Sequence, residues 1–120
     1  MDALFVELPA FERYRSDYLD DADFRLLQQL LLLQPHIGDV IKGTGGLRKM
    51  RFANALRQKG KRGGMRIIYY WWSAGQQFWL FTLYGKELQD DLTTQQCQAL
   101  KQLLEHEYLM RTTHATQYLH

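Results

Sequence analysis

The chain has 120 residues, enough for one domain with a single hydrophobic core, and its composition is that of an ordinary globular protein. Its longest apolar runs, Ile67–Trp72 and Phe78–Leu83, are too short to cross a bilayer, which takes about 20 residues. The segment MDALFVELPAF lacks the basic and apolar regions of a signal peptide, and the single cysteine, Cys97, excludes an internal disulfide, so we expect a cytoplasmic protein.

The first part of the chain predicts a strand followed by two helices. Residues Ala3–Glu7 form an apolar–polar segment that is typical of a strand. Pro9 fits the first turn of a helix, Asp20 or Asp21 caps a second helix, and Pro35 ends it. The residues that repeat at helical spacing, and are therefore expected to be buried, are Phe11, Tyr14, Tyr18, Phe24, Leu27, Leu30 and Leu31.

The second part predicts three strands and a last helix. Leu47–Phe52 alternates between polar and apolar residues, whereas Met65–Trp72 is almost continuously apolar, which is typical of a central strand covered on both faces. Phe78–Tyr84 is a further apolar strand, and the three most simply form an antiparallel meander. Residues Thr93–Gln96 match a helix capping box, and the tail from residue 111 to residue 120 has no clear pattern. The expected buried stripe of this helix is Cys97, Leu100, Leu104 and Tyr108.

This order of elements predicts one α+β domain over residues 1–120, in which helices pack on one face of a small twisted antiparallel β-sheet. Between the second helix and the next strand, Gly38–Gly46 is expected to be a loop. Its glycines Gly43, Gly45 and Gly46 do not match a phosphate-binding P-loop, so a flexible turn is the better interpretation.

The most unusual feature of the sequence is a block of positive charge between Lys42 and Arg66. The chain carries 15 Lys and Arg and 13 Asp and Glu, for a net charge of +2. Nine of the positive and none of the negative side chains lie in the block, so the other six positive and 13 negative side chains give the rest of the chain a charge of −7. Such a block attracts polyanions and binds phosphates, although a solvated basic loop is the simpler alternative.

The sequence has no pattern that is typical of a metal site or of a nucleotide-binding loop. The four histidines have no paired spacing such as HExxH, Cys97 has no second cysteine beside it, and neither a GxSxG nor a GxxxxGK[ST] motif occurs. We therefore expect neither a metal nor a cofactor.

The charge pattern suits a reaction on RNA that needs no metal. If Met50 and Phe52 face the core, Lys49 and Arg51 face outward together, and Arg66 is expected at the surface beside them. The 2′-hydroxyl of RNA can attack the adjacent phosphate, so the protein must supply cations, a base for the 2′ proton and an acid for the leaving 5′ oxygen. A lysine among cations can be that base, since like charges lower its pKa.

Two further groups of residues extend this surface. The basic turn Arg57–Gly64 carries Lys61 and Arg62 and is expected to be mobile without a ligand. Aromatic residues of the following strands can stack on splayed bases, although packing in the core is their more common role. These aromatic residues are Tyr69, Tyr70, Trp71, Trp72 and Tyr84.

Three elements, GDVIKGTGGLRKMR, GKRGGMRIIYYW and LYGKELQDDLTTQQ, resemble in order and spacing the HigB-type branch of the RelE toxin family, and the resemblance extends from about Phe5 to Tyr108. The resemblance implies a type II toxin that cleaves mRNA on the ribosome and is neutralised by a small antitoxin from a neighbouring gene. It also implies a fold with an antiparallel sheet and helices. We expect the antitoxin either to cover the basic face or to hold the toxin in an inactive shape.

The resemblance also implies roles for individual residues. The basic pair on the family's second strand falls on Lys49 and Arg51, and the arginine that opens the next strand falls on Arg66. The original RelE members have an arginine and a tyrosine beyond the last strand, where this sequence instead has Lys86 followed by Glu87. The expected catalytic residues, with Lys86 and Tyr84 as substitutes, are Lys49, Arg51, Lys61, Arg66, Tyr84 and Lys86. The cations expected to bind RNA and the ribosome are Lys42, Arg48, Arg57, Lys59 and Arg62.

Two other functions fit the same sequence. The departure at Glu87 suits a catalytically silent relative that binds only nucleic acid or its antitoxin. The basic block alone also suits an unrelated RNA-binding domain. Growth arrest on expression in a bacterium distinguishes the toxin from the silent relative, and an adjacent gene of antitoxin length argues against the unrelated domain.

Overall fold

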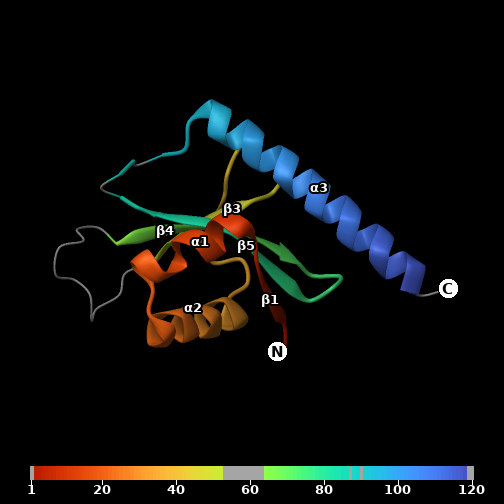
Figure 1. The fold of residues 1–120 in the computed structure, drawn as a ribbon, viewed down its shortest axis with the longest axis horizontal. Helices are drawn as coiled ribbons and strands as arrows, with labels where there is room; N and C mark the ends of the chain where they lie inside the picture. Colours follow the sequence, from red (N-terminus) through yellow and green to blue (C-terminus); the bar gives the residue numbers. More distant parts are fainter. Residues whose placement is uncertain (1, 53–63, 87, 90, 119–120) are drawn as a thin grey trace.

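The computed structural model describes residues 2–52, 64–86, 88, 89 and 91–118, which form a five-stranded sheet and three helices (Figure 1). In chain order the elements are β1 (Leu4–Glu7), α1 (Pro9–Tyr18), α2 (Asp21–Leu33), β2 (Asp39–Val40), β3 (Arg48–Phe52), β4 (Met65–Trp72), β5 (Gln77–Gly85) and α3 (Thr94–Tyr118). The strands lie in the order β1-β5-β4-β3-β2, and β3, β4 and β5 form the predicted antiparallel meander. The α+β class predicted from the sequence is confirmed.

The two edges of the sheet differ from the sequence prediction. β1 pairs with β5 in parallel, so the sheet is mostly rather than entirely antiparallel. The backbone N–H of Leu4 donates to the carbonyl of Gln76 at 3.0 Å, and that of Leu8 to the carbonyl of Leu80 at 2.9 Å. β1 thus supplies partners for backbone groups that the meander leaves open along β5. At the other edge, the predicted loop contains the two-residue strand β2, which pairs with β3.

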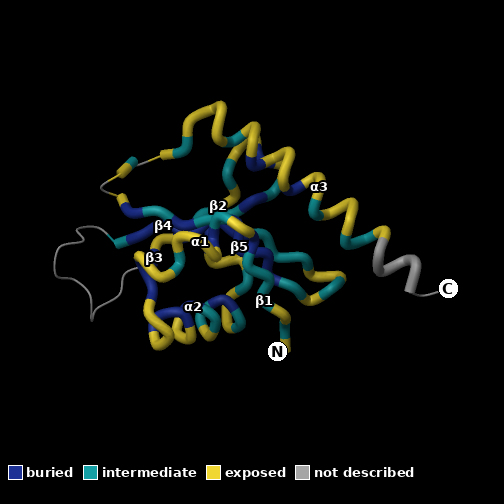
Figure 2. Tube along the Cα trace, in the orientation of Figure 1, coloured by how far each residue is buried: buried dark blue, intermediate teal, exposed yellow. Residues whose placement is uncertain are grey.

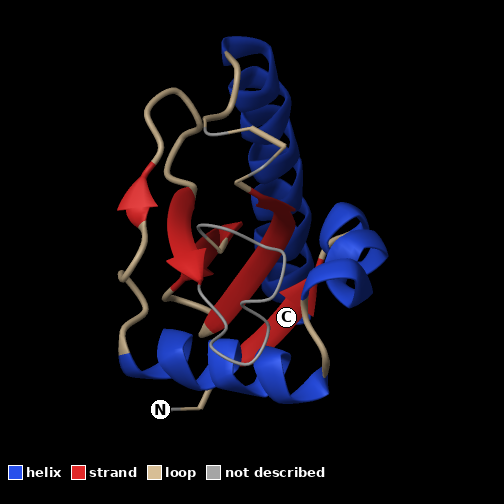
Figure 3. Ribbon diagram, turned by 90° about the vertical axis from the view of Figure 1, so that its left-hand side faces the viewer, coloured by secondary structure: helices blue, strands red, loops and turns tan. Residues whose placement is uncertain are grey.

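The helices cover both faces of the sheet, so the prediction that they pack on one face is wrong. One cluster of buried side chains joins α1 and α2 to Met50, Ile67 and Tyr69, and a second joins α3 to Ile68 and Trp79. Neighbouring residues of β4 therefore point into different cores. The physical reason is that β4 and β5 are apolar on both faces, and apolar surface exposed to water on either face is unfavourable. Figure 1 shows α2 and α3 on opposite sides of the strands, and Figure 3 shows α3 behind them.

The predicted helix starts are confirmed at their caps. Asp20 is the N-cap of α2: its side chain accepts from the backbone N–H of Asp23, whose own side chain accepts from Asp20. Before α3, the hydroxyl of Thr93 accepts a hydrogen bond from the backbone N–H of Gln96, and the side-chain oxygen of Gln96 accepts one from the backbone N–H of Thr93. The far end of α3 departs from the sequence analysis, because the helix continues through Arg111 to Tyr118.

A bulge in β5 sets the register between β4 and β5. Ile68 pairs with Thr82, but the next residue, Tyr69, pairs with Leu80, so Phe81 is an extra residue in β5. Beyond the bulge, Arg66 pairs with Tyr84. Figure 2 shows the buried strands in the middle of the molecule and α3, most of whose described residues are exposed. Among the described residues, none of the helices has the length and apolar character needed to cross a membrane.

Candidate nucleic-acid interface

Three of the predicted site residues form a row across the sheet. Arg51 in β3 pairs with Arg66 in β4, which pairs on its other side with Tyr84 in β5. Directly opposed residues project on the same face, with Cβ atoms about 5 Å apart. Lys49 is two residues from Arg51 and shares this face, while Met50 and Phe52 lie in the opposite core, as the alternation predicted. We call Lys49, Arg51, Arg66 and Tyr84 the cationic row.

Arg66 does not lie at the surface as expected, since only 4% of it is exposed. It is central in the sheet, between β3 and β5, whereas its neighbour Arg51 is exposed. The charge of Arg66 acts on both the Tyr84 hydroxyl and the Asp91 carboxylate. Arg66 therefore provides a buried positive charge close to Tyr84 and Asp91, and a guanidinium keeps that charge at any physiological pH.

The segment before α3 adds a carboxylate to a face that the sequence predicted to have none. The ammonium nitrogen of Lys49 lies 3.0 Å from Oδ1 of Asp91. Hydrogen bonding and charge from Lys49 lower the pKa of Asp91, and the charges of Arg66 and Arg51 lower it further. Asp91 lies outside the basic block in the sequence, and the segment that carries it comes back to Lys49 near the start of β3.

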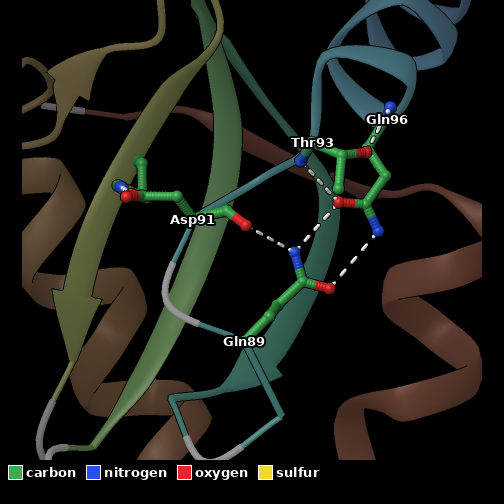
Figure 4. Close-up of polar contacts among 5 residues, drawn as sticks. Gln89, Asp91, Thr93 and Gln96 are labelled. Carbon is green, nitrogen blue, oxygen red and sulfur yellow. Dashed lines mark hydrogen bonds and ion pairs between the residues drawn. The ribbon is translucent and has the colours of Figure 1, made fainter.

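A polar clasp fixes the backbone that carries Asp91 (Figure 4). The side-chain amide of Gln89 donates to the backbone carbonyl of Asp91 and to the side-chain oxygen of Gln96, both at 2.9 Å. The Gln96 amide donates back to the Gln89 oxygen at 3.3 Å. Because Gln96 also belongs to the α3 capping box, the start of this helix and the position of Asp91 are set by the same contacts.

Tyr84 has the most unusual environment in the cationic row. Its hydroxyl is buried and has no hydrogen-bond partner among the described residues. Burial raises the pKa of Tyr84; the Arg66 charge opposes this, and Asp91 and Cys97 add to it. The phenol therefore keeps its proton at neutral pH, next to a guanidinium. The hydroxyl is shielded from solvent in this structure, so it can donate to a phosphate ester only after the side chains around it move.

The other predicted cations divide into three groups. Lys42 and Lys86 are exposed and lie near the cationic row: Lys42 lines a cavity together with Lys49, and the backbone N–H of Lys86 donates to the carbonyl of Gly64, just before β4. Arg48 is engaged elsewhere. The predicted residues Arg57, Lys59, Lys61 and Arg62, and the turn that carries them, lie outside the described residues.

Arg48 belongs to the loop after α2 rather than to the cationic row. Its guanidinium donates to the carbonyl of Gly38 at 2.7 Å and to that of His36 at 3.3 Å. Arg48 precedes Lys49 in β3, so its side chain projects on the opposite face. The structure therefore places Arg48 apart from the cationic row, in contact with the loop after α2.

Most of the strand aromatics pack inside the protein. Tyr69 is fully buried, and its hydroxyl accepts from the N–H of Gly38 at 3.0 Å and donates to the carbonyl of Pro35 at 2.8 Å. Tyr70 and Trp72 pack against Trp79, with ring centroids 5.3 and 5.4 Å away. These contacts favour core packing over base stacking. Among the described residues, no group of three or more His, Cys, Asp and Glu side chains is arranged to hold a metal ion.

No protein-family model matches the chain. Its backbone is similar to that of a double arginine-to-alanine mutant of the E. coli toxin RelE, solved in the free state. The two share 15% sequence identity with a TM-score of 0.49, and the match covers 75% of this chain and 90% of the RelE chain. A likeness at this level assigns no role to any residue of this protein.

Proposed function

We propose that the chain is the toxin of a type II toxin–antitoxin system, of the HigB-type branch of the RelE family. In this proposal it acts in the cytoplasm as a ribosome-dependent endoribonuclease that cleaves mRNA in the A site and so blocks translation. Its partners are mRNA, the ribosome and an antitoxin encoded by an adjacent gene. The observation that carries the proposal is the alignment of Arg51, Arg66 and Tyr84 across three strands, with Lys49 on the same face.

The cationic row suits metal-independent attack by the 2′-hydroxyl of the substrate. In this proposal Arg51 and Arg66 stabilise the charge that develops on the phosphate, and each such donor contributes about 3–4 kcal/mol in comparable sites. Tyr84 donates its proton to the leaving 5′ oxygen, which requires its buried hydroxyl to become exposed to the substrate. One of the remaining catalytic lysines, Lys49, Lys61 or Lys86, in its neutral form accepts the proton of the attacking 2′-hydroxyl.

A second function is favoured by the ion pair between Lys49 and Asp91. The pair neutralises one of the three cations of the cationic row in the free protein. A nuclease of this kind needs an unpaired lysine as the base, whereas a catalytically silent protein that binds only RNA or its antitoxin needs only positive charge on this face. Induced expression separates the two: growth arrest supports the nuclease, and normal growth of well-folded protein supports the silent relative.

The test of the nuclease is cleavage of mRNA by the purified protein on programmed ribosomes. One mRNA carries a single 2′-deoxy nucleotide immediately 5′ of the scissile phosphate, and a control mRNA carries it one nucleotide further 3′. We expect only the control to be cut, with a 2′,3′-cyclic phosphate or 3′-phosphate on the product. Equal cleavage of both RNAs contradicts attack by the 2′-hydroxyl. Chelation is no substitute for this test, since ribosomes themselves need Mg²⁺.

A further inference from the structure

A cavity of about 520 Å³ lies between the turn that follows β2 and the first half of α3. Lysines from three separate parts of the chain line it: Lys42 from the turn, Lys49 from β3 and Lys101 from α3. Asp91 lines it as well. Lys101 lies 35 positions beyond the end of the basic block, so only the tertiary structure brings it to the other two lysines.

The turn and the helix that form the two walls share one hydrophobic cluster, in which Ile41 and Leu47 lie with Leu100 and Leu104. Thr44 is fully buried, and its hydroxyl donates to the carbonyl of Ile41 at 2.7 Å, which closes the turn on itself. A Cβ atom on Gly45 would lie 3.9 Å from Cγ of Lys101. The glycine-rich turn is thus packed against α3, and Lys42 and Lys101 are held on walls whose separation is set by this packing.

Lys49 connects this cavity to the cationic row, because it belongs to both. In the free protein its ammonium is engaged by Asp91, whose side chain is 83% exposed. Solvent screens an ion pair of this kind, so the pair is weak and a stronger anion can displace the carboxylate. The hydrogen bonds of Gln89 and Gln96 hold the backbone of Asp91 without using its carboxylate.

We propose that the cavity binds an RNA backbone phosphate, adjacent on the same strand to the phosphate held by Arg51 and Arg66, and that Lys101 is a phosphate-binding residue. Lys42, Lys49 and Lys101 supply its positive charge, as lysines do for phosphate groups generally. Asp91 occupies Lys49 in the free protein and is displaced by the RNA. The inference rests on the proposed function, since it names how the same face holds its substrate.

The test measures binding of a fluorescent single-stranded RNA hexanucleotide, fully 2′-O-methylated so that it cannot be cleaved, to the full chain. Anisotropy titrations at salt concentrations from 50 to 200 mM compare Lys101→Ala with the wild type. The logarithm of the binding constant falls linearly with the logarithm of the salt concentration, and loss of one phosphate contact makes this slope shallower by about 0.7. Between 50 and 200 mM salt, the fold-loss of affinity in Lys101→Ala should therefore be about 2.6 times smaller than in the wild type. Arg25→Ala is the matched control: it removes the same charge from an exposed position on α2, across the sheet.

Asp91 is tested with the same probe. Asp91→Asn frees Lys49 and should raise the affinity for the hexanucleotide about twofold. Glu12→Gln changes the net charge equally from an exposed position on α1 and should leave the affinity at the wild-type value. An equal gain in both variants would mean that net charge, and not displacement of the carboxylate, explains the effect.

The inference is wrong if the hexanucleotide does not bind, or if Lys101→Ala and Lys42→Ala both keep the wild-type slope. It is also wrong if these variants bind RNA normally but lose affinity for the antitoxin, since the cavity is then a protein-docking site. Failure of the proposed function looks different: ribosome-bound mRNA stays intact with wild-type protein while Lys101→Ala still shows the reduced slope. A wild type that cleaves, with an unchanged slope in Lys101→Ala, refutes the phosphate site alone.

Discussion

Replacing Tyr84 by phenylalanine should make the protein more stable and less active. Its hydroxyl is buried without a hydrogen-bond partner among the described residues, and such a group costs about 1–3 kcal/mol of folding free energy. Tyr84→Phe removes that cost and keeps the ring, so we expect a gain of about 1 kcal/mol, which at this chain length raises Tm by about 4 °C. If Tyr84 donates the proton to the leaving oxygen, cleavage on the ribosome should fall about 10²–10⁴-fold.

Tyr69→Phe is the matched control, because it is the same chemical change in the neighbouring strand with the opposite expected sign. The Tyr69 hydroxyl bonds to the N–H of Gly38 and to the carbonyl of Pro35, and both partners would be left unsatisfied. We expect a loss of about 1–3 kcal/mol. Urea denaturation of both variants gives the two free energies. Equal destabilisation by the two substitutions would show that the Tyr84 hydroxyl is bonded in solution, and unchanged cleavage by Tyr84→Phe would remove it as the proton donor.

Three further predictions concern the surroundings of the cationic row. Arg66→Ala should abolish cleavage and lower the free energy of unfolding by about 2–4 kcal/mol, since Arg66 is buried. Arg51→Ala, at the exposed neighbour, should also abolish cleavage but change the free energy of unfolding by no more than about 0.5 kcal/mol. Pairing with Lys49 lowers the pKa of Asp91 in the folded protein. The pair therefore stabilises the fold at pH values above the pKa of an aspartate in the unfolded chain, about 3.9. This stability is lost as the pH falls through the lower pKa of the folded protein. The stabilities of wild type and Asp91→Asn should therefore differ at about pH 6 and converge in acid. Gly38→Ala should cost about 1–3 kcal/mol, because its Cβ would lie 3.0 Å from the Lys49 backbone and from the Tyr69 ring.

Each of these predictions has an outcome that contradicts it. Wild-type stability in Arg66→Ala would mean that the buried guanidinium contributes nothing net to folding. A constant difference between wild type and Asp91→Asn at every pH would show that the ion pair does not titrate with this carboxyl. A fully stable Gly38→Ala would mean that the loop after α2 relaxes away from β3 and β4.

The local structure followed from short stretches of sequence, because the forces that set it act over a few residues. Asp20 caps α2 and Thr93 precedes α3 where the capping patterns predicted them. The alternation in β3 correctly separated Lys49 from Met50, and the apolar run correctly bounded β4 as Met65–Trp72. Side-chain period and capping chemistry need no knowledge of the rest of the chain.

The arrangement of the site depended on contacts between residues far apart in sequence. The basic block predicted positive charge, but the burial of Arg66 depends on its place between β3 and β5, and the approach of Asp91 depends on the connection that follows β5. Lys101 reaches the same cavity only because α3 covers the face that the first two helices leave open. The sequence alone determined which residues are charged and which elements form, apart from the short strand β2. Burial and pairing are properties of the packed sheet, in which strands that are apolar on both sides require helices on both faces, and that packing decided which charges meet.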